Sequence, residues 1–227
     1  MTGDPDGPPG SPGSSRGSRR RRGTGHELRQ VVLDATAELL AGTGDVEALT
    51  MRAVATAAGV TAPSVYRHFP DKRSLVQAVI SDRFAAFTAA LRAAADRGGG
   101  GGDPLERLAA MAHAYVTTGL GDPGTYRVLF SATNAGPAGL GLAPGAAHPG
   151  AAAFQVLLDA VTACLPPPAA EPDPQSVPVL AIELWASLHG LVDLRITKPE
   201  MPWPDPAPLV RRALNPIRSA VEDRRSR

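Results

Sequence analysis

Cysteine is almost absent from this chain of 227 residues, in which Cys164 is the only one. A single cysteine excludes an internal disulfide framework and any metal site built on a Cys-x-x-Cys pair. Chains that live in a reducing compartment carry few cysteines and no lasting disulfides. We therefore expect a cytoplasmic protein that folds without covalent cross-links.

Long uncharged hydrophobic runs are also missing. The N-terminal segment has basic residues with no apolar stretch after them, which excludes a secretory signal peptide. The most apolar windows, residues 179–196 and 84–95, are interrupted by charged side chains that the core of a bilayer rejects. The sequence thus predicts a soluble chain with no membrane-spanning segment.

The patterns that carry catalysis are lacking as well. There is no glycine-rich phosphate loop, no nucleophile elbow and no His-Glu-x-x-His zinc pattern. The five histidines are scattered along the chain, at His26, His68, His113, His148 and His189. We expect no catalytic residue, no metal and no cofactor, so a small helical enzyme is only an alternative.

Apolar residues recur at helical spacing from His26 onward. In the first predicted helix, Leu28, Val31, Val32, Ala35, Leu39 and Leu40 share one face. Further helices are expected to begin near Thr50, Thr61, Asp71, Asp103 and Pro123, and to span residues 150–165, 175–197 and 208–222. No convincing strand is found, so the predicted class is all-α with about nine helices.

Residues 50–72 have the pattern of a helix-turn-helix. Two short predicted helices flank Gly59 and Val60, where glycine permits a sharp turn and valine fills the gap between the helices. Val54, Val65 and Phe69 would fix the angle at which the helices cross. An ordinary helical hairpin in a core is the alternative, but the polar side chains concentrated on the second helix favour DNA binding.

The segment from Ala55 to Lys72 closely resembles the TetR family of regulators, in the run A-x-x-A-G-V-x-x-x-x-x-Y-x-H-F-x-x-K. The resemblance covers about residues 27–75. It implies a three-helix DNA-binding domain followed by a larger helical domain for ligand binding and dimerisation.

The same resemblance implies roles for individual residues. Residues that would contact the phosphate backbone are Thr50, Tyr66, His68 and Lys72, and Arg52 would reach guanine. The exposed positions of the recognition helix are Thr61, Ala62, Pro63, Ser64 and Arg67. Because Ala62 and Pro63 lack hydrogen-bonding side chains, base selection would depend on methyl contacts, the two arginines and DNA shape.

Residues 1–24 carry no aromatic or branched aliphatic side chain and include the run Arg19 to Arg22. Such a segment cannot bury enough apolar surface to offset chain entropy, so we predict a disordered basic tail. The run either extends the DNA footprint or is simply solvated.

Residues 183–192, ELWASLHGLV, resemble the Trp-x-x-x-His-Gly class of TetR C-terminal domains. Trp185 and His189 lie four residues apart on one helix face and are candidates either for a ligand pocket or for plain core. The other candidate pocket residues are Phe84, Phe87, Met111, Tyr115, Arg127 and Phe130.

Helices near 175–197 and 208–222 are expected to pair with their twins in a homodimer, through Leu184, Leu188, Leu191, Leu209, Leu214 and Ile217. The predicted domains are a tail (1–24), a DNA-binding domain (25–72), a ligand-binding and dimerisation domain (73–222) and a short tail (223–227). The predicted function is a dimeric repressor of a pseudo-palindromic operator, released by a small apolar ligand. A ligand-independent dimeric DNA-binding protein is the main alternative.

Overall fold

A computed structural model describes residues 25–98, 102–130, 148–165 and 176–226, which form helices and turns without a β-strand. The helices are α1 (Gly25–Thr43), α2 (Met51–Ala57), α3 (Ala62–Tyr66), α4 (Lys72–Gly98), α5 (Pro104–Gly121), α6 (Pro123–Phe130), α8 (Ala151–Cys164), α9 (Ser176–Thr197), α10 (Pro206–Ala213) and α11 (Asn215–Arg225). The all-α prediction is confirmed. The arginine run 19–22 and the segments 99–101, 131–147 and 166–175 lie outside the described residues.

Helix α1 is covered by neighbours on more than one side, because α2, α4 and α6 all pack against it. The sequence pattern placed Val31 on its buried face, but Val31 is 46% exposed and Leu39 is only partly buried. Leu33 and Thr36 occupy buried positions instead. The predicted stripe is displaced because packing by α6, which comes from a distant part of the chain, also decides which residues of α1 are buried.

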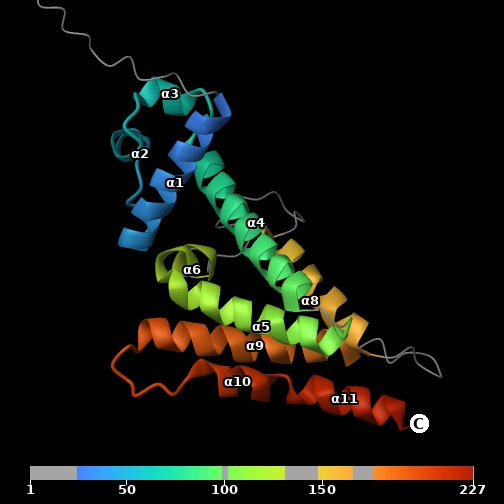
Figure 1. Ribbon diagram of the computed structural model, residues 1–227. Coiled ribbons are helices and arrows are strands. Elements are labelled where there is room, and N and C mark those ends of the chain that lie inside the picture. Colours follow the sequence, from blue (N-terminus) through green and yellow to red (C-terminus); the bar gives the residue numbers. More distant parts are fainter. Residues whose placement is uncertain (1–24, 99–101, 131–147, 166–175, 227) are drawn as a thin grey trace, which may run out of the picture.

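Helix α4 links the two halves of the molecule. Asp71 caps its N-terminus, where Oδ1 accepts a hydrogen bond from the backbone N–H of Ser74 at 2.7 Å. Apolar residues recur along this helix at helical spacing, which predicts one buried stripe, and all of them are buried: Leu75, Val79, Ile80, Phe84, Phe87 and Leu91. In Figure 1, α4 leaves the group formed by α1, α2 and α3 and runs down to α5 and α8.

The C-terminal helices form a second body beneath α4. Helices α5, α9 and the α10–α11 pair lie side by side, and α8 packs against α4, α5 and α9 (Figure 1). The absence of a side chain at Gly119 lets α5 approach its neighbours closely. A Cβ atom there would lie 2.8 Å from Cγ1 of Val192 and 2.9 Å from the ring of Tyr126.

Where we expected one helix over 208–222, the chain forms α10 and α11, with a break at Leu214. Asp205 caps α10, because its Oδ1 accepts from the N–H of Ala207 at 3.0 Å. Pro216 lies in the first turn of α11, where its missing N–H is tolerated, whereas inside a continuous helix it would clash with the preceding turn. Helix α11 also continues to Arg225, into the segment expected to be a tail.

The leucines expected to face a second chain mostly belong to the core of this one. Leu184, Leu188, Leu214 and Ile217 are at most 3% exposed within the single chain, and Leu191 and Leu209 are partly buried. That assignment is corrected: the large exposed apolar residues of α9 are Val179, Ile182, Trp185 and Leu194. Because α9 is apolar on both faces, its sequence alone does not distinguish the inner face from the outer one.

The length and composition of residues 177–197 would by themselves allow α9 to cross a membrane. The charged residues within this segment, Glu183, Asp193 and Arg195, predict that it does not span a membrane. One face of α9 packs against α5, α8 and α10, as in the core helix of a globular domain. The exposed residues Val179, Ile182 and Leu194 add a second apolar face, which raises the mean hydropathy of the helix.

Candidate functional site

Two short helices and the turn between them form the predicted helix-turn-helix. The Thr50 hydroxyl caps α2 by accepting from the N–H of Ala53 at 3.1 Å. Gly59 has a φ of +65°, a left-handed conformation that favours glycine. Behind the turn, Val65 and Phe69 are buried against the core that α1 and α4 share with these helices. The turn and its core therefore hold α3 in a defined orientation.

The side chains of the predicted recognition helix are available at the surface. Tyr66 is 51% exposed, and Arg52, Thr61, Pro63 and Arg67 are also exposed. Ala62, Ser64 and His68 are partly buried. Figure 1 places α3 at the end of the molecule farthest from α10 and α11. An extended surface such as a DNA duplex can approach this end.

Three of these side chains form a small hydrogen-bonded row. The hydroxyls of Thr61 and Ser64 lie 2.9 Å apart, and Nη2 of Arg67 donates to Oγ of Ser64 at 3.2 Å. The Thr61 hydroxyl makes no bond that caps α3. Ser64 thus holds the Arg67 guanidinium against the helix while its other donors remain available.

The ammonium group of Lys72, which was predicted to contact a DNA phosphate, is already bonded within the chain. Its Nζ donates to the carbonyl oxygens of Val46 and Glu47 at 3.2 and 3.3 Å, and it forms a 3.3 Å ion pair with the Glu47 carboxylate. A phosphate contact through Nζ would compete with these oxygens. The ammonium group instead ties the start of α4 to the loop before α2.

Polar and close contacts connect α1 to the rest of the molecule. Arg83 of α4 forms an ion pair with Asp34 of α1, and the Gln30 amide of α1 donates to Oδ2 of Asp82 of α4 at 3.4 Å. At the other end of α1, a Cβ atom at Gly124 of α6 would lie 2.8 Å from Cβ of Ala41. Motion of α4 or α6 would therefore be transmitted directly to α1.

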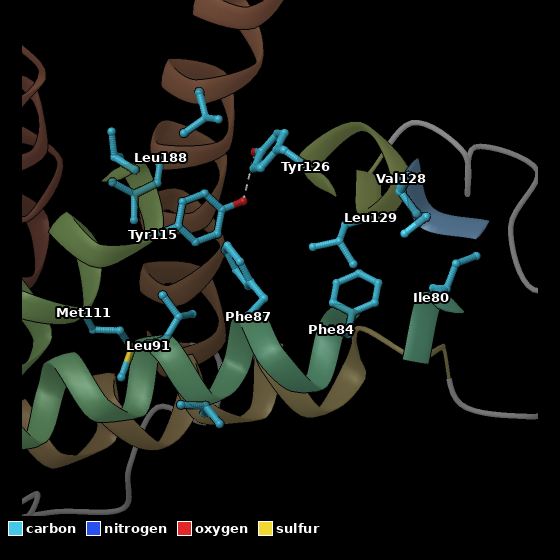
Figure 2. Close-up of a cluster of buried hydrophobic side chains, with 14 of the residues drawn as sticks. Ile80, Phe84, Phe87, Leu91, Met111, Tyr115, Tyr126, Val128, Leu129 and Leu188 are labelled. Atoms are coloured by element: carbon cyan, nitrogen blue, oxygen red, sulfur yellow. Dashed lines mark hydrogen bonds between the residues drawn. The ribbon is translucent and has the colours of Figure 1, made fainter. Parts of the chain in front are cut away.

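A cavity of about 550 Å³ lies within the C-terminal body, between α4, α5, α6, α8 and α9. Seven of the eight predicted pocket residues line it: Phe84, Phe87, Met111, Tyr115, Phe130, Trp185 and His189. Arg127 does not, because its position on α6 faces outward and its side chain is exposed. Figure 2 shows Phe84 and Phe87 of α4 near Tyr115 of α5 and Leu129 of α6.

Three polar side chains from three helices meet beside the cavity, which Tyr115 and His189 line and Tyr126 does not. The Tyr126 hydroxyl lies 2.6 Å from Nδ1 of His189. It also lies 3.2 Å from the Tyr115 hydroxyl, as Figure 2 shows. Burial raises the pKa of Tyr115 to about 12 and raises the pKa of Tyr126 above its ordinary value. Burial also lowers the pKa of His189, although nearby Asp193 acts in the opposite direction. Near neutral pH, this cluster is uncharged.

Several cavity residues were missed by the sequence analysis. His148, which precedes α8, packs edge-to-face on Phe84 with ring centroids 5.7 Å apart, and Phe154 of α8 lies 5.7 Å from Trp185. Leu157 and Leu188 also line the cavity. The sequence predicted helices over these residues, but no local signal distinguished cavity from core.

No group of three or more His, Cys, Asp or Glu residues that could hold a metal ion occurs in the described parts of the chain. Cys164 is buried, and its Sγ lies 3.2 Å from the Ala160 carbonyl oxygen. Burial raises the pKa of this thiol to about 11, which disfavours the reactive thiolate. The thiol therefore behaves as a core group.

An exposed recognition helix on a helix-turn-helix, joined by one long helix to a helical body, defines a DNA-binding transcription regulator. Two family models match the chain: "Bacterial regulatory proteins, tetR family" over residues 32–79, and "Tetracyclin repressor-like, C-terminal domain" over residues 108–216. Together they cover more than half of it. The protein belongs to the TetR family of transcription regulators, a family of regulators rather than enzymes. The resemblance of residues 183–192 to the Trp-x-x-x-His-Gly class stays a prediction.

Solved structures share the fold over most of the chain. A TetR family transcription regulator from Marinobacter aquaeolei VT8 has a TM-score of 0.61 at 20% identity, covering 86% of this chain and 96% of its own. A TetR-family transcriptional regulator from Streptomyces coelicolor has a TM-score of 0.56 at 20% identity, covering 87% of this chain and 99% of its own. A protein of unknown function from Rhodococcus sp. RHA1 has a TM-score of 0.68 at 24% identity, covering 90% of this chain and 100% of its own. No curated protein matches the sequence.

Proposed function

We propose that this regulator is a cytoplasmic repressor that binds a pseudo-palindromic operator as a homodimer and leaves it when a small apolar ligand fills the cavity. The observation that carries the proposal is the exposure of Tyr66 and Arg67 on α3, at the far end of the molecule from the cavity helices. The DNA-binding domain would be residues 25–72 and the ligand-binding and dimerisation domain residues 73–222, with α4 linking them.

The DNA contacts fall into two groups. Arg52 and Arg67 carry exposed guanidinium groups that suit guanine edges in the major groove. Thr50, Tyr66 and His68 would contact phosphates, with Lys72 contributing only after its ion pair with Glu47 rearranges. Thr61, Ala62, Pro63 and Ser64 would face the bases, the apolar pair through methyl contacts with thymine.

The outer stripe of α9 supports dimerisation. Val179, Ile182 and Leu194 are each about half exposed and, with Ala186 and Gly190, fall on one side of the helix. Nothing lies within 4 Å of a Cβ atom built at Gly190, so a second helix can approach there closely. The outer faces of α10 and α11 carry exposed Arg211 and Arg218, so α9 would provide most of the apolar contact. Two recognition helices roughly 34 Å apart would then read two half-sites.

Coupling between cavity and DNA would use α4 and α6. Both helices line the cavity, through Phe84 and Phe87 of α4 and Phe130 of α6, and both contact α1. A ligand that spreads these walls would displace α1 and the recognition helix that packs with it. Such coupling requires the ligand to bind the two conformations with different affinity. The cavity volume favours this sensor over a ligand-independent DNA-binding protein with a solid core.

A selection experiment tests the DNA-binding half of the proposal. The purified full chain is used to enrich duplexes from a random library, and the mass of the resulting complex is measured by analytical ultracentrifugation. We expect an enriched inverted repeat with two chains, or a multiple of two, per duplex. Enrichment of no sequence, or a complex with one chain, would contradict the proposal.

A further inference from the structure

The cavity gathers aromatic side chains in a chain that has few of them. The whole sequence holds five Phe, three Tyr and two Trp. Six of these line the cavity: Phe84, Phe87, Tyr115, Phe130, Phe154 and Trp185. The rings of Phe84 and Phe130 meet at 84°, and those of Phe87 and Tyr115 at 82°. Edge-to-face walls present both ring faces and ring edges to the interior, which favours contact with a flat ring system.

The cavity offers no counter-charge. None of its lining residues in the described part of the chain is Asp, Glu, Lys or Arg. Tyr115 keeps its proton and His189 is neutral near pH 7, for the burial reasons given above. A carboxylate or an ammonium group would lose its hydration there without gaining an ion pair, at a cost of several kcal/mol. A charged ligand is therefore disfavoured.

The polar cluster leaves one donor for the ligand. The Tyr115 hydroxyl lies 3.2 Å from the Tyr126 hydroxyl and 3.5 Å from Nδ1 of His189. Two hydroxyls thus face Nδ1, and we assign the nearer one, that of Tyr126 at 2.6 Å, as the donor to this nitrogen. In a neutral imidazole whose Nδ1 accepts, Nε2 carries the proton. No partner for Nε2 occurs among the described residues.

We propose that the cavity takes an uncharged, ring-containing apolar molecule with an oxygen atom that accepts a hydrogen bond from Nε2–H of His189. Tyr115 and Tyr126 act as positioning residues that fix this tautomer. The inference rests on the proposed function in taking the cavity as the ligand site. It adds the shape, charge and polarity that the ligand must have.

Four probes test these properties separately: fluorenone, fluorene, fluorene carboxylate and dodecanol. In a Trp203→Phe chain the remaining tryptophan, Trp185, lies at the cavity and reports binding by its fluorescence. We expect fluorenone to bind tightest and fluorene about three- to tenfold more weakly, for lack of one hydrogen bond. The carboxylate should bind at least about a hundredfold more weakly than fluorenone. Dodecanol, a flexible chain, should also bind more weakly than fluorenone.

Two variants locate the hydrogen bond. His189→Leu should remove the preference for fluorenone over fluorene while fluorene affinity changes less than about twofold. Tyr126→Phe keeps the ring but releases the tautomer, and should reduce that preference. Arg127→Ala, next to Tyr126 but outside the cavity, is the control and should change neither affinity. Binding of the carboxylate as tight as that of fluorenone, survival of the preference in both variants, or no binding of any probe would overturn the inference.

The same preparations are tested on the duplex enriched by the wild-type chain. If duplex binding is intact while the probe pattern fails, only the ligand class is overturned. If the wild-type chain binds no duplex, the proposed function fails whatever the probes show.

Discussion

The recognition segment and the cavity use their side chains in opposite ways. On α3, Tyr66 and Arg67 extend into solvent and contribute little to the core, whereas Val65 and Phe69 support the helix from beneath. In the cavity, residues such as Tyr115 and Phe87 are buried, so the groups offered to a ligand also hold the helices together. DNA binding should therefore be separable from stability by mutation, whereas ligand binding should not.

The largest effect is expected where the recognition helix meets its core. Phe69→Ala removes a ring that is 3% exposed and should lower the free energy of unfolding by about 3–5 kcal/mol. Urea denaturation followed by circular dichroism measures this loss. Tyr66→Ala, at the exposed end of α3 three residues before Phe69, serves as the control and should change it by less than about 0.5 kcal/mol. Equal losses in the two variants would contradict the separation of core from surface.

The buried hydroxyl of Tyr115 predicts a loss of stability in alkali. Because its pKa is about 12 in the folded chain and near 10 when unfolded, stability is complete below pH 10 and is lost as pH rises towards 12. The loss from this group should approach about 2–3 kcal/mol. Urea titrations at several pH values should show a flatter alkaline profile for Tyr115→Phe. An identical profile for both proteins would refute the assignment.

A substitution at Arg67 should weaken DNA binding and leave the stability of the fold unchanged. Arg67→Ala should weaken binding to the enriched duplex by about tenfold or more, because a guanidinium contact to a base is worth about 1–3 kcal/mol. The unfolding midpoint should not move. Arg127→Ala, an equally exposed arginine on α6, is the matched control. Fluorescence anisotropy measures duplex affinity in both variants. Equal losses of affinity in Arg67→Ala and Arg127→Ala would contradict the recognition role of Arg67.

The smallest predicted change concerns the cap of α2. Thr50→Ala removes the 3.1 Å hydrogen bond to the N–H of Ala53 and should cost about 1 kcal/mol. Thr56→Ala also removes a hydroxyl, but one that bonds to the Arg52 carbonyl oxygen within the helix rather than to a free N–H. Thermal unfolding should lower the midpoint for Thr50→Ala only. A larger effect of Thr56→Ala would contradict the capping role.

The helix-turn-helix could be predicted in detail because its determinants are local. Thr50 and Gly59 act through neighbours a few residues away, and the four-residue spacing of Val65 and Phe69 already places both on one side of the chain, so local spacing shows these roles. The cap at Asp71 and the stripe of α4 were likewise predicted and are present.

The outer faces of the helices could not be predicted in the same way. Val31 is exposed because α6 and α4 determine the buried side of α1, and Leu184 is buried because α9 packs on three helices. The cavity combines residues from five helices. The sequence shows that a helix position is apolar, but not whether its side chain packs against a neighbouring helix or lines a cavity. His148 is a case in point, since its role depends on the distant ring of Phe84.

The coupling of cavity to DNA is tested most directly by filling the cavity without any ligand. Ala153 of α8 lines the cavity, whereas the adjacent Ala152 is exposed and does not. Anisotropy titrations of the enriched duplex should show weaker binding by Ala153→Phe, by about fivefold or more as expected for a coupling of 1–3 kcal/mol, and no change for Ala152→Phe. If both variants bind the duplex as the wild-type chain does, the cavity does not control DNA binding.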